Sequence, residues 1–267
     1  MASSASWLQR VAEALGPVTS RQALGGSAWR IEAGGRAVVA KVGPGSADEA
    51  GGLRLLGSVA GAPAVPEVVM GDSELLVTSW VEPHRRSDAA LERLGRELAA
   101  LHGTPAECWG GGSGWIGACR VDVAEHADGP AFYGARLVEL ARRCGLEGPV
   151  TAVARRLGEL VPFTAPAVLH GDLWWGNVLW GAGDRPWLID PSCHGGHPEE
   201  DLAMLGLFGA VPPRLVAAYG EVRPLAPGWP ERVPLFQLYP LLVHAVLFGG
   251  GYRVRAEAIA RHFASAS

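Results

Sequence analysis

The chain has 267 residues, of which 48% are hydrophobic and 19% are charged, as is usual for a well-packed globular protein with one large domain or two lobes. Its formal net charge of −4 excludes the basic surface that binds nucleic acid, so we expect no nucleic-acid partner. The four cysteines, at positions 108, 119, 144 and 193, form no Cys-x-x-Cys pair, which argues against a disulfide framework and favours a reducing, cytoplasmic location.

Three segments that look like targeting or metal-binding signals are interpreted otherwise. Residues 1–16 lack the basic start and apolar core of a signal peptide. The most apolar stretch, 233–251, is interrupted by polar residues and by Pro240, and it predicts a buried helix broken near this proline rather than a membrane span. "CHGGH" at 193–197 has no second cluster of ligands to join it, so we expect no metal site there and no contact with a membrane.

The first third of the chain has the patterns of a short helix followed by strands. Residues 6–15 show apolar positions at helical spacing, and "AWRIEA" and "RAVVAKV" around Gly34-Gly35 predict a hairpin. Ser46 followed by Glu49 has the spacing of a capping box that opens a helix through Leu56. "PEVVMG" and "ELLVTSW" predict a second hairpin.

The remainder of the chain has mainly helical patterns. We expect helices over about 91–102, 130–145 and 150–161 and again from Glu199 onward, a glycine-rich loop at 110–117, and short apolar strands at 167–169, 178–181 and 186–189. A β-rich start joined to an α-rich remainder predicts an α+β protein with two lobes and a ligand cleft between them. We place the boundary between residues 1–82 and 83–267.

The most informative motif is His170-Gly171-Asp172, with Asn177 five residues after the aspartate and Asp190 after the next short strand. This is the spacing of a kinase catalytic loop, in which the aspartate accepts a hydroxyl proton and the asparagine and the later aspartate bind magnesium. Magnesium prefers such hard oxygen ligands. The alternative is that Asp172 and Asn177 only stabilise a tight loop.

Lys41 is the only lysine among 23 cationic side chains. A composition so biased towards arginine tolerates lysine where a compact ammonium is needed, for example between two phosphates, although an exposed cation at a strand end is the alternative. Glu49 can complete the capping box or pair with Lys41, as the helix glutamate of kinases does. Gly25, Gly26 and Ser27 can form a turn over the phosphates, because glycines let backbone N–H groups approach closely.

These motifs and their order along the chain resemble the fructosamine kinase family, within the protein-kinase-like and aminoglycoside-phosphotransferase-like superfamily. The resemblance covers nearly the whole chain and is carried by "HGDLWWGNV", "IDPSCHGGHPEEDLAMLGLFG" and "LFQLYPLLVHAVLFGGGY". It implies a two-lobed protein-kinase-like fold with a small β-rich N-terminal lobe and a larger α-helical C-terminal lobe.

The resemblance also implies roles for individual residues. Asp172 would be the catalytic base, Asn177 and Asp190 would bind Mg²⁺, and Lys41 with Glu49 would hold the ATP phosphates. The backbone of Ser79 and Val81 would contact adenine. Asp201 would brace the catalytic loop, unless it only favours the start of a helix. Trp174 would stack on the sugar of the acceptor, with Trp175 and Trp180 in packing roles; core packing is the competing interpretation for Trp174.

The family therefore predicts a cytoplasmic kinase that transfers the γ-phosphate of ATP to a sugar hydroxyl of a ketoamine (fructosamine or ribulosamine) on a free amine or a protein lysine, and we favour a monomer. Pro198, Trp115 and Val243 depart from the usual family residues on the acceptor side, so the acceptor is less certain than ATP. Gly26 and Ser27 replace the redox-active cysteine of some relatives, so no disulfide-linked dimer is predicted. The alternatives are a kinase of the same fold acting on an aminoglycoside, choline or another amino alcohol, and a nucleotide-binding pseudokinase.

Overall fold

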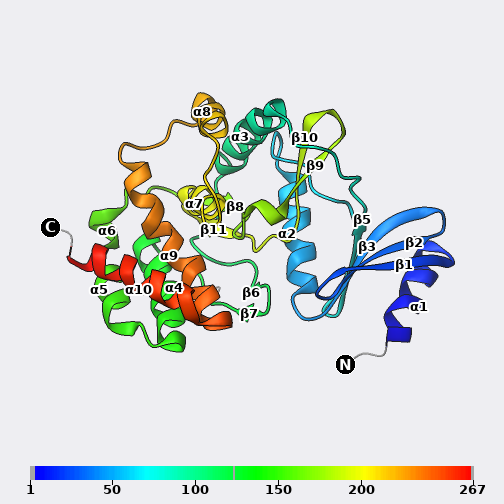
Figure 1. Cartoon of the computed structure of the whole chain (residues 1–267), viewed down its shortest axis with the longest axis horizontal. Coiled ribbons are helices and arrows are strands. Elements are labelled where there is room, and N and C mark those ends of the chain that lie inside the picture. Colours follow the sequence, from blue (N-terminus) through cyan, green and yellow to red (C-terminus); the bar gives the residue numbers. More distant parts are fainter. Residues whose placement is uncertain (1–3, 123, 266–267) are drawn as a thin grey trace.

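The computed structural model describes residues 4–122 and 124–265. A five-stranded sheet with helices α1 and α2 forms one part, and a larger, mainly helical part lies beside it (Figure 1). The elements of the first part are α1 (Ser4–Leu15), β1 (Val18–Gly25), β2 (Ala28–Ala33), β3 (Arg36–Val42), α2 (Ser46–Ser58), β4 (Val68–Gly71) and β5 (Leu75–Ser79). The predicted α+β fold class is thereby confirmed.

The sheet is antiparallel with the strand order β1-β2-β3-β5-β4. Both predicted hairpins are present, as β2–β3 and β4–β5. The first needs glycine at its turn, because a Cβ added to Gly34 (φ 54°) would lie 1.7 Å from the carbonyl oxygen of Leu15. Residues such as Ile31, Val38 and Val77 form the core between the sheet and α1.

The predicted capping box at the start of α2 is wrong. Gly45, in the left-handed conformation (φ 89°), precedes the first residue of the helix, and no side chain caps it. Ser46 is already helical, and its hydroxyl donates to the carbonyl of Gly43 at 2.8 Å. A serine can cap a helix only from an extended residue outside it, so Glu49 is left free for another partner.

The second part contains the helices α3 (Asp88–His102), α4 (Gly129–Cys144), α5 (Glu147–Ala154), α6 (Leu157–Leu160), α7 (Glu199–Leu205), α8 (Pro213–Val222), α9 (Trp229–Phe248) and α10 (Gly250–Ser265). Between them lie the short strands β6 (Trp115–Ile116), β7 (Cys119–Arg120), β8 (Ala167–Leu169), β9 (Val178–Gly181), β10 (Arg185–Leu188) and β11 (His194–Gly196). The helix predicted over 150–161 is two short helices that part at Arg155-Arg156, where the Arg156 amide bonds to Val153, three residues back. In the described part of the chain, no helix has the length and apolar character needed to cross a bilayer.

Helix α9 continues through Pro240, so the predicted break is wrong. Proline lacks the N–H that would bond to the carbonyl four residues earlier, which here belongs to Phe236. The hydroxyl of the buried Tyr133, on α4, donates to this carbonyl at 3.1 Å. The lost backbone bond is therefore replaced, and the helix stays buried without an unpaired carbonyl at this position.

Besides the chain segment that follows β5, a second segment connects the two parts. Residues 59–65, between α2 and β4, pack against the core of the helical part. The Ala64 amide donates to the carbonyl of Pro186 at 3.2 Å, and the Leu188 amide donates to Ala64 at 2.7 Å. The boundary placed at residues 82 and 83 stays a prediction, and the segment 59–65 belongs by its contacts to the larger part.

Candidate active site

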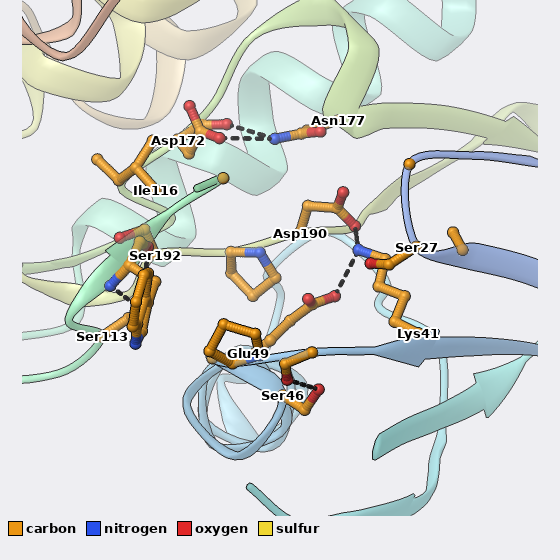
Figure 2. Close-up of a pocket in the computed structure, with 18 of the residues that line it drawn as sticks. Ser27, Lys41, Ser46, Glu49, Ser113, Ile116, Asp172, Asn177, Asp190 and Ser192 are labelled. Carbon is orange, nitrogen blue, oxygen red and sulfur yellow. Dashed lines mark hydrogen bonds and ion pairs between the residues drawn. The ribbon is translucent and has the colours of Figure 1, made fainter. Parts of the chain in front are cut away.

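A pocket opens between the sheet and the helical part (Figure 2). The part with the sheet contributes the β1–β2 turn with Gly25, Gly26 and Ser27, the end of β3 with Lys41, and the first turns of α2 with Glu49. The helical part contributes Asp172, Trp174, Asn177 and Asp190, together with the loop from Ser113 to Gly117. Most of the side chains singled out by sequence thus line one cavity, although they are up to 165 positions apart.

Lys41 lies on the central strand β3 and faces two carboxylates. Its Nζ is 2.9 Å from Oε1 of Glu49 and also contacts Oδ1 of Asp190 (Figure 2). Burial opposes the ammonium, but the charges of Asp190 and Glu49 outweigh it and raise the pKa of Lys41. Burial raises the pKa of the Glu49 carboxyl to about 7, which Lys41 only partly counteracts. Glu49 therefore pairs with Lys41 and does not cap α2.

The catalytic-loop motif follows the buried strand β8. Gly171 has φ 82°, and a Cβ at this position would lie 2.0 Å from the carbonyl oxygen of Ser192, so the turn needs glycine. The backbone N–H groups of His170 and Gly171 donate to the two carboxylate oxygens of Asp201 at 2.8 and 2.9 Å. This pair of bonds holds the turn against the start of α7.

The groups around Asp201 stabilise its ionised form. Its Oδ2 is 3.2 Å from Nε2 of His102, whose Nδ1 is 3.0 Å from the hydroxyl of Tyr219. Burial alone would raise the pKa of Asp201, but hydrogen bonding and charge from His102, with a contribution from His170, lower it. The chain Tyr219–His102–Asp201 connects the loop to α3 and α8. A role for Asp201 in positioning the loop stays a prediction.

Asp172 and Asn177 face each other directly. The Nδ2 of Asn177 donates to the Asp172 carbonyl at 2.8 Å and to its Oδ2 at 3.3 Å (Figure 2). This orientation leaves the amide oxygen Oδ1 of Asn177 for another partner. Burial, with a further contribution from the charge of Asp190, raises the pKa of Asp172 to about 7, which is near the value that suits a group that accepts a proton at neutral pH.

Asp190 lies two residues after the end of β10, at the open end of the β9–β10 hairpin. The Ile189 amide donates to the carbonyl of Asn177 at 3.1 Å, so the two predicted metal ligands start from adjacent backbone positions. Asp190 has φ 57°, a conformation that aspartate tolerates better than most residues and that is frequent at functional sites. Its carboxylate lines the pocket beside Lys41.

The available oxygens fit a hydrated magnesium ion. Oδ1 of Asn177 and the carboxylate of Asp190 are hard ligands, and magnesium in phosphoryl-transfer sites usually takes one or two such side chains, with phosphate oxygens and water completing its shell. In residues 4–122 and 124–265 no group of three or more His, Cys, Asp or Glu side chains is arranged to hold a metal ion. Two protein side chains would leave the other positions of such a shell to phosphate oxygens and water.

An apolar slot continues from Lys41 towards the chain segment after β5. It is lined by Ala28, Val39, Leu76, Leu179 and Ile189, and by residues 78–81. The N–H of Ser79 already donates to the Glu67 carbonyl at 2.9 Å, so Ser79 can offer only its carbonyl to a ligand. Among the described residues the Val81 amide has no hydrogen-bond partner. If these two residues contact adenine as predicted, Ser79 accepts a hydrogen bond through its backbone carbonyl and Val81 donates one through its backbone amide.

Trp174 lies at the rim of the pocket and is 39% exposed. A Cβ at Gly176 would lie 2.2 Å from Cη2 of the indole, so the ring rests on the backbone of this glycine. Trp175 and Trp180 instead pack against the core beneath the β9–β10 hairpin, where core-packing roles were expected.

Sequence reasoning missed the contact between the glycine-rich loop and α2. The Gly114 amide donates to Oδ2 of Asp48 at 3.2 Å, and the Trp115 ring lies so close to Gly45 that an added Cβ would be 3.2 Å from it. Asp48 precedes the partner of Lys41, so the loop braces the helix that carries Glu49. Only the glycine content marked this loop in the sequence, and glycine content does not tell which element a loop will contact.

The fold and the pocket define a phosphotransferase of the protein-kinase-like fold that acts on an alcohol group. A family model described as fructosamine kinase matches residues 27–265. A probable ketoamine kinase of Thermus thermophilus, TTHA1179, is 37% identical over 194 residues, which are 70% of this chain and 71% of that protein. The chain belongs to the fructosamine kinase family.

Solved structures agree with this assignment. A protein of Thermobifida fusca described as a putative fructosamine-3-kinase is 38% identical, with a TM-score of 0.86 over 98% of this chain and 99% of that chain. The aminoglycoside phosphotransferase APH(4)-Ia, in a ternary complex with ADP and hygromycin B, is 18% identical with a TM-score of 0.64 over 98% of this chain and 99% of that one. This second likeness shows the fold alone.

Proposed function

We propose that the protein is an ATP- and Mg²⁺-dependent kinase that phosphorylates a sugar hydroxyl of a ketoamine. The observation that carries the proposal is the convergence of Lys41, Glu49, Asp172, Asn177 and Asp190 in one pocket. Membership of a kinase family implies the use of ATP, and the name printed for the Thermus relative is ketoamine kinase. We also propose that residues 1–82 act as the nucleotide-binding lobe.

In this proposal each residue has a defined task. Lys41, oriented by Glu49, neutralises phosphate charge, while adenine occupies the apolar slot and meets the Ser79 carbonyl and the Val81 amide. Asn177 and Asp190 hold Mg²⁺, which supplies charge neutralisation at the phosphates. Asp172 orients the acceptor hydroxyl and takes its proton as the oxygen bonds to the γ-phosphorus and the bond to the β-phosphate oxygen breaks, releasing ADP.

The glutamates near the acceptor side argue against a polycationic acceptor such as an aminoglycoside. Such an acceptor would need free carboxylates, and "HPEE" (197–200) offered the best candidates. Glu199 is instead bound by the guanidinium of Arg232, with Nε 2.9 Å from Oε2, and Glu200 lies 3.4 Å from Arg136. Both glutamates are buried and already paired, so they are structural and leave the ketoamine as the better-supported acceptor.

The test is ATP-dependent phosphate transfer to synthetic fructosyl- and ribulosyl-amines, with the mass of the product determined. A mass increase of one phosphate on a ketoamine, absent when Asp172 is replaced by Asn, supports the proposal. Transfer to choline, an aminoglycoside or another amino alcohol in place of every ketoamine would overturn the acceptor assignment. Nucleotide binding without transfer to any of these acceptors would favour the pseudokinase alternative.

A further inference from the structure

A strip of aromatic rings leads from the pocket to the surface of the helical part. Trp174 and Phe208 meet edge to face, with ring centroids 6.0 Å apart. Phe208 meets His244 at 5.4 Å, and His244 lies 4.9 Å from Tyr252 and 5.8 Å from Phe248. We call Trp174, Phe208, His244, Phe248 and Tyr252 the aromatic strip. It comes from four separate segments of the chain, so no local sequence pattern reveals it.

Three rings of the aromatic strip are exposed to solvent, unlike the side chains of a hydrophobic core. Trp174 is 39% exposed, Phe208 47% and Phe248 68%. A single exposed aromatic residue needs no explanation, but contiguous exposed rings usually mark a binding surface. Phe248 ends α9 and Tyr252 belongs to the first turn of α10, so the outer end of the strip is formed where these two helices meet.

The inner end of the strip is continuous with the reacting group. His244 lines a small pocket together with Asp172 and Gly171, and Trp174 lines the main pocket together with Asp172. The Nδ1 of His244 lies 2.7 Å from the Pro240 carbonyl. A carbonyl can only accept, so Nδ1 carries the hydrogen and Nε2 is left available as an acceptor. Ile116 lines both pockets, so the two are adjacent.

The charges around the inner end favour a cation. The small pocket is lined by Asp172, Glu200 and Asp201, and its lining includes no lysine or arginine. Glu200 is offset by Arg136 and Asp201 by its loop contacts, so Asp172 is the carboxylate left to act on a ligand. Aromatic faces attract ammonium groups and cover apolar carbon equally well. A substituted ammonium with an apolar chain fits both properties.

We propose that the aromatic strip is the subsite for the amine substituent of the acceptor. This inference rests on the proposed function: with the sugar hydroxyl at Asp172 and the sugar stacked on Trp174, the amine nitrogen and its substituent extend from Trp174 over Phe208 towards Phe248. The enzyme accordingly prefers ketoamines of apolar or aromatic amines over those of methylamine. The preference is set by residues that take no part in phosphate chemistry.

The test is a series of fructosyl-amines that differ only in the substituent: methyl, hexyl and benzyl. For the natural chain we expect kcat/KM to be on the order of tenfold higher for hexyl and benzyl than for methyl, since each fully covered methylene contributes about fourfold and a half-exposed surface covers the equivalent of about one or two of them. Phe248→Ala should reduce this ratio to about threefold and leave the methyl substrate and the KM for ATP unchanged. Phe248→Leu, which keeps apolar area, should retain most of the preference.

Val222→Ala is the matched control, because Val222 is 52% exposed at the end of α8 and lies outside the strip. Equal kcat/KM across the series, or an equal loss for all substrates in Phe248→Ala, would overturn the subsite while leaving the kinase activity intact. Transfer to none of the series would overturn the proposed function and the subsite with it. A change of oligomeric state in Phe248→Ala, measured by sedimentation, would show that the strip is covered by a second copy and would also overturn the proposal.

Discussion

The two sides of the pocket are built from different kinds of interaction. On the phosphate side, Lys41, Glu49 and Asp190 form a compact set of charges, tied together by short contacts. On the acceptor side, the rings of Trp174, Phe208 and Phe248 are partly exposed; Trp174 contacts Phe208, and His244 connects Phe208 to Phe248. Directional charge contacts fix one geometry and suit a constant ligand such as a nucleotide phosphate, whereas apolar faces fit ligands of several shapes. The chemistry and the choice of acceptor are thus open to separate alteration.

The largest expected effect separates chemistry from nucleotide binding. Asp172→Asn keeps the size of the side chain but cannot take a proton, so we expect kcat to fall about 10³-fold, within the range for loss of a general base. The affinity for ADP, measured by calorimetry, should change less than about twofold, because Asp172 contacts Asn177 and not Lys41. A comparable loss of ADP affinity would show that the two sides of the pocket are not independent.

A replacement of the single lysine should affect the phosphate side alone. Lys41→Arg keeps the charge, but its planar fork cannot place one compact donor between Glu49 and Asp190, so kcat/KM for ATP should fall about 10²-fold. Arg30→Lys is the control: it also exchanges arginine and lysine, but on the neighbouring strand β2 and outside the pocket, so it should leave kcat/KM for ATP unchanged. Steady-state kinetics with ATP varied would measure both. Near-normal activity of Lys41→Arg would indicate that charge alone suffices.

The raised pKa values predict opposite effects of pH on activity and stability. Asp172 and Glu49 titrate near 7 in the folded chain and near 4 when unfolded, so between these values the folded state binds more protons. Rising pH through this window should therefore lower the free energy of unfolding, by at most about 1.4 kcal/mol per pH unit for each group, while kcat/KM rises towards pH 7.

Urea unfolding at pH 5 to 8, without nucleotide, would measure this slope. Asp172→Asn should flatten it, and Glu49→Gln should flatten it separately, because each removes one of the two titrating groups. A slope that is unchanged in both variants would contradict the assignment of the raised values to these carboxyls. The pH profile of kcat/KM in the natural chain serves as the independent check on Asp172.

A smaller effect is expected at the hydrogen bond between Asp48 on α2 and the Gly114 amide of the glycine-rich loop. Asp48→Ala removes the acceptor for the Gly114 amide, so α2 loses its brace and Glu49 orients Lys41 less well. We expect kcat/KM for ATP to fall about fivefold, which corresponds to the roughly 1 kcal/mol that a typical hydrogen bond contributes. Asp48→Asn retains an acceptor oxygen and should lose less than half of this effect. Equal losses in both variants would argue for a role of the charge itself.

The phosphate side was predictable because its residues come in short motifs whose chemistry limits the alternatives. The spacing of the motif indicates Asp172 and Asn177, and the composition of the chain indicates Lys41. On the acceptor side only Trp174 was predicted, since Phe208, His244 and Phe248 resemble ordinary core residues. The capping box and the break at Pro240 failed for a related reason: Glu49 and the Phe236 carbonyl found partners distant in the sequence, Lys41 and Tyr133, which local patterns do not reveal.

The two backbone hydrogen bonds between Ala64 and β10 limit how the two parts of the molecule can move. They tie the far end of α2 to the same hairpin that carries Asp190, so that end of the helix cannot travel with the sheet. A movement of the sheet relative to the helical part would then have to change the backbone at three connections: residues 43–45, the residues between Ala64 and β4, and the residues after β5. Asn177 and Asp190, the proposed magnesium ligands, would stay beside the β9–β10 hairpin during such a movement.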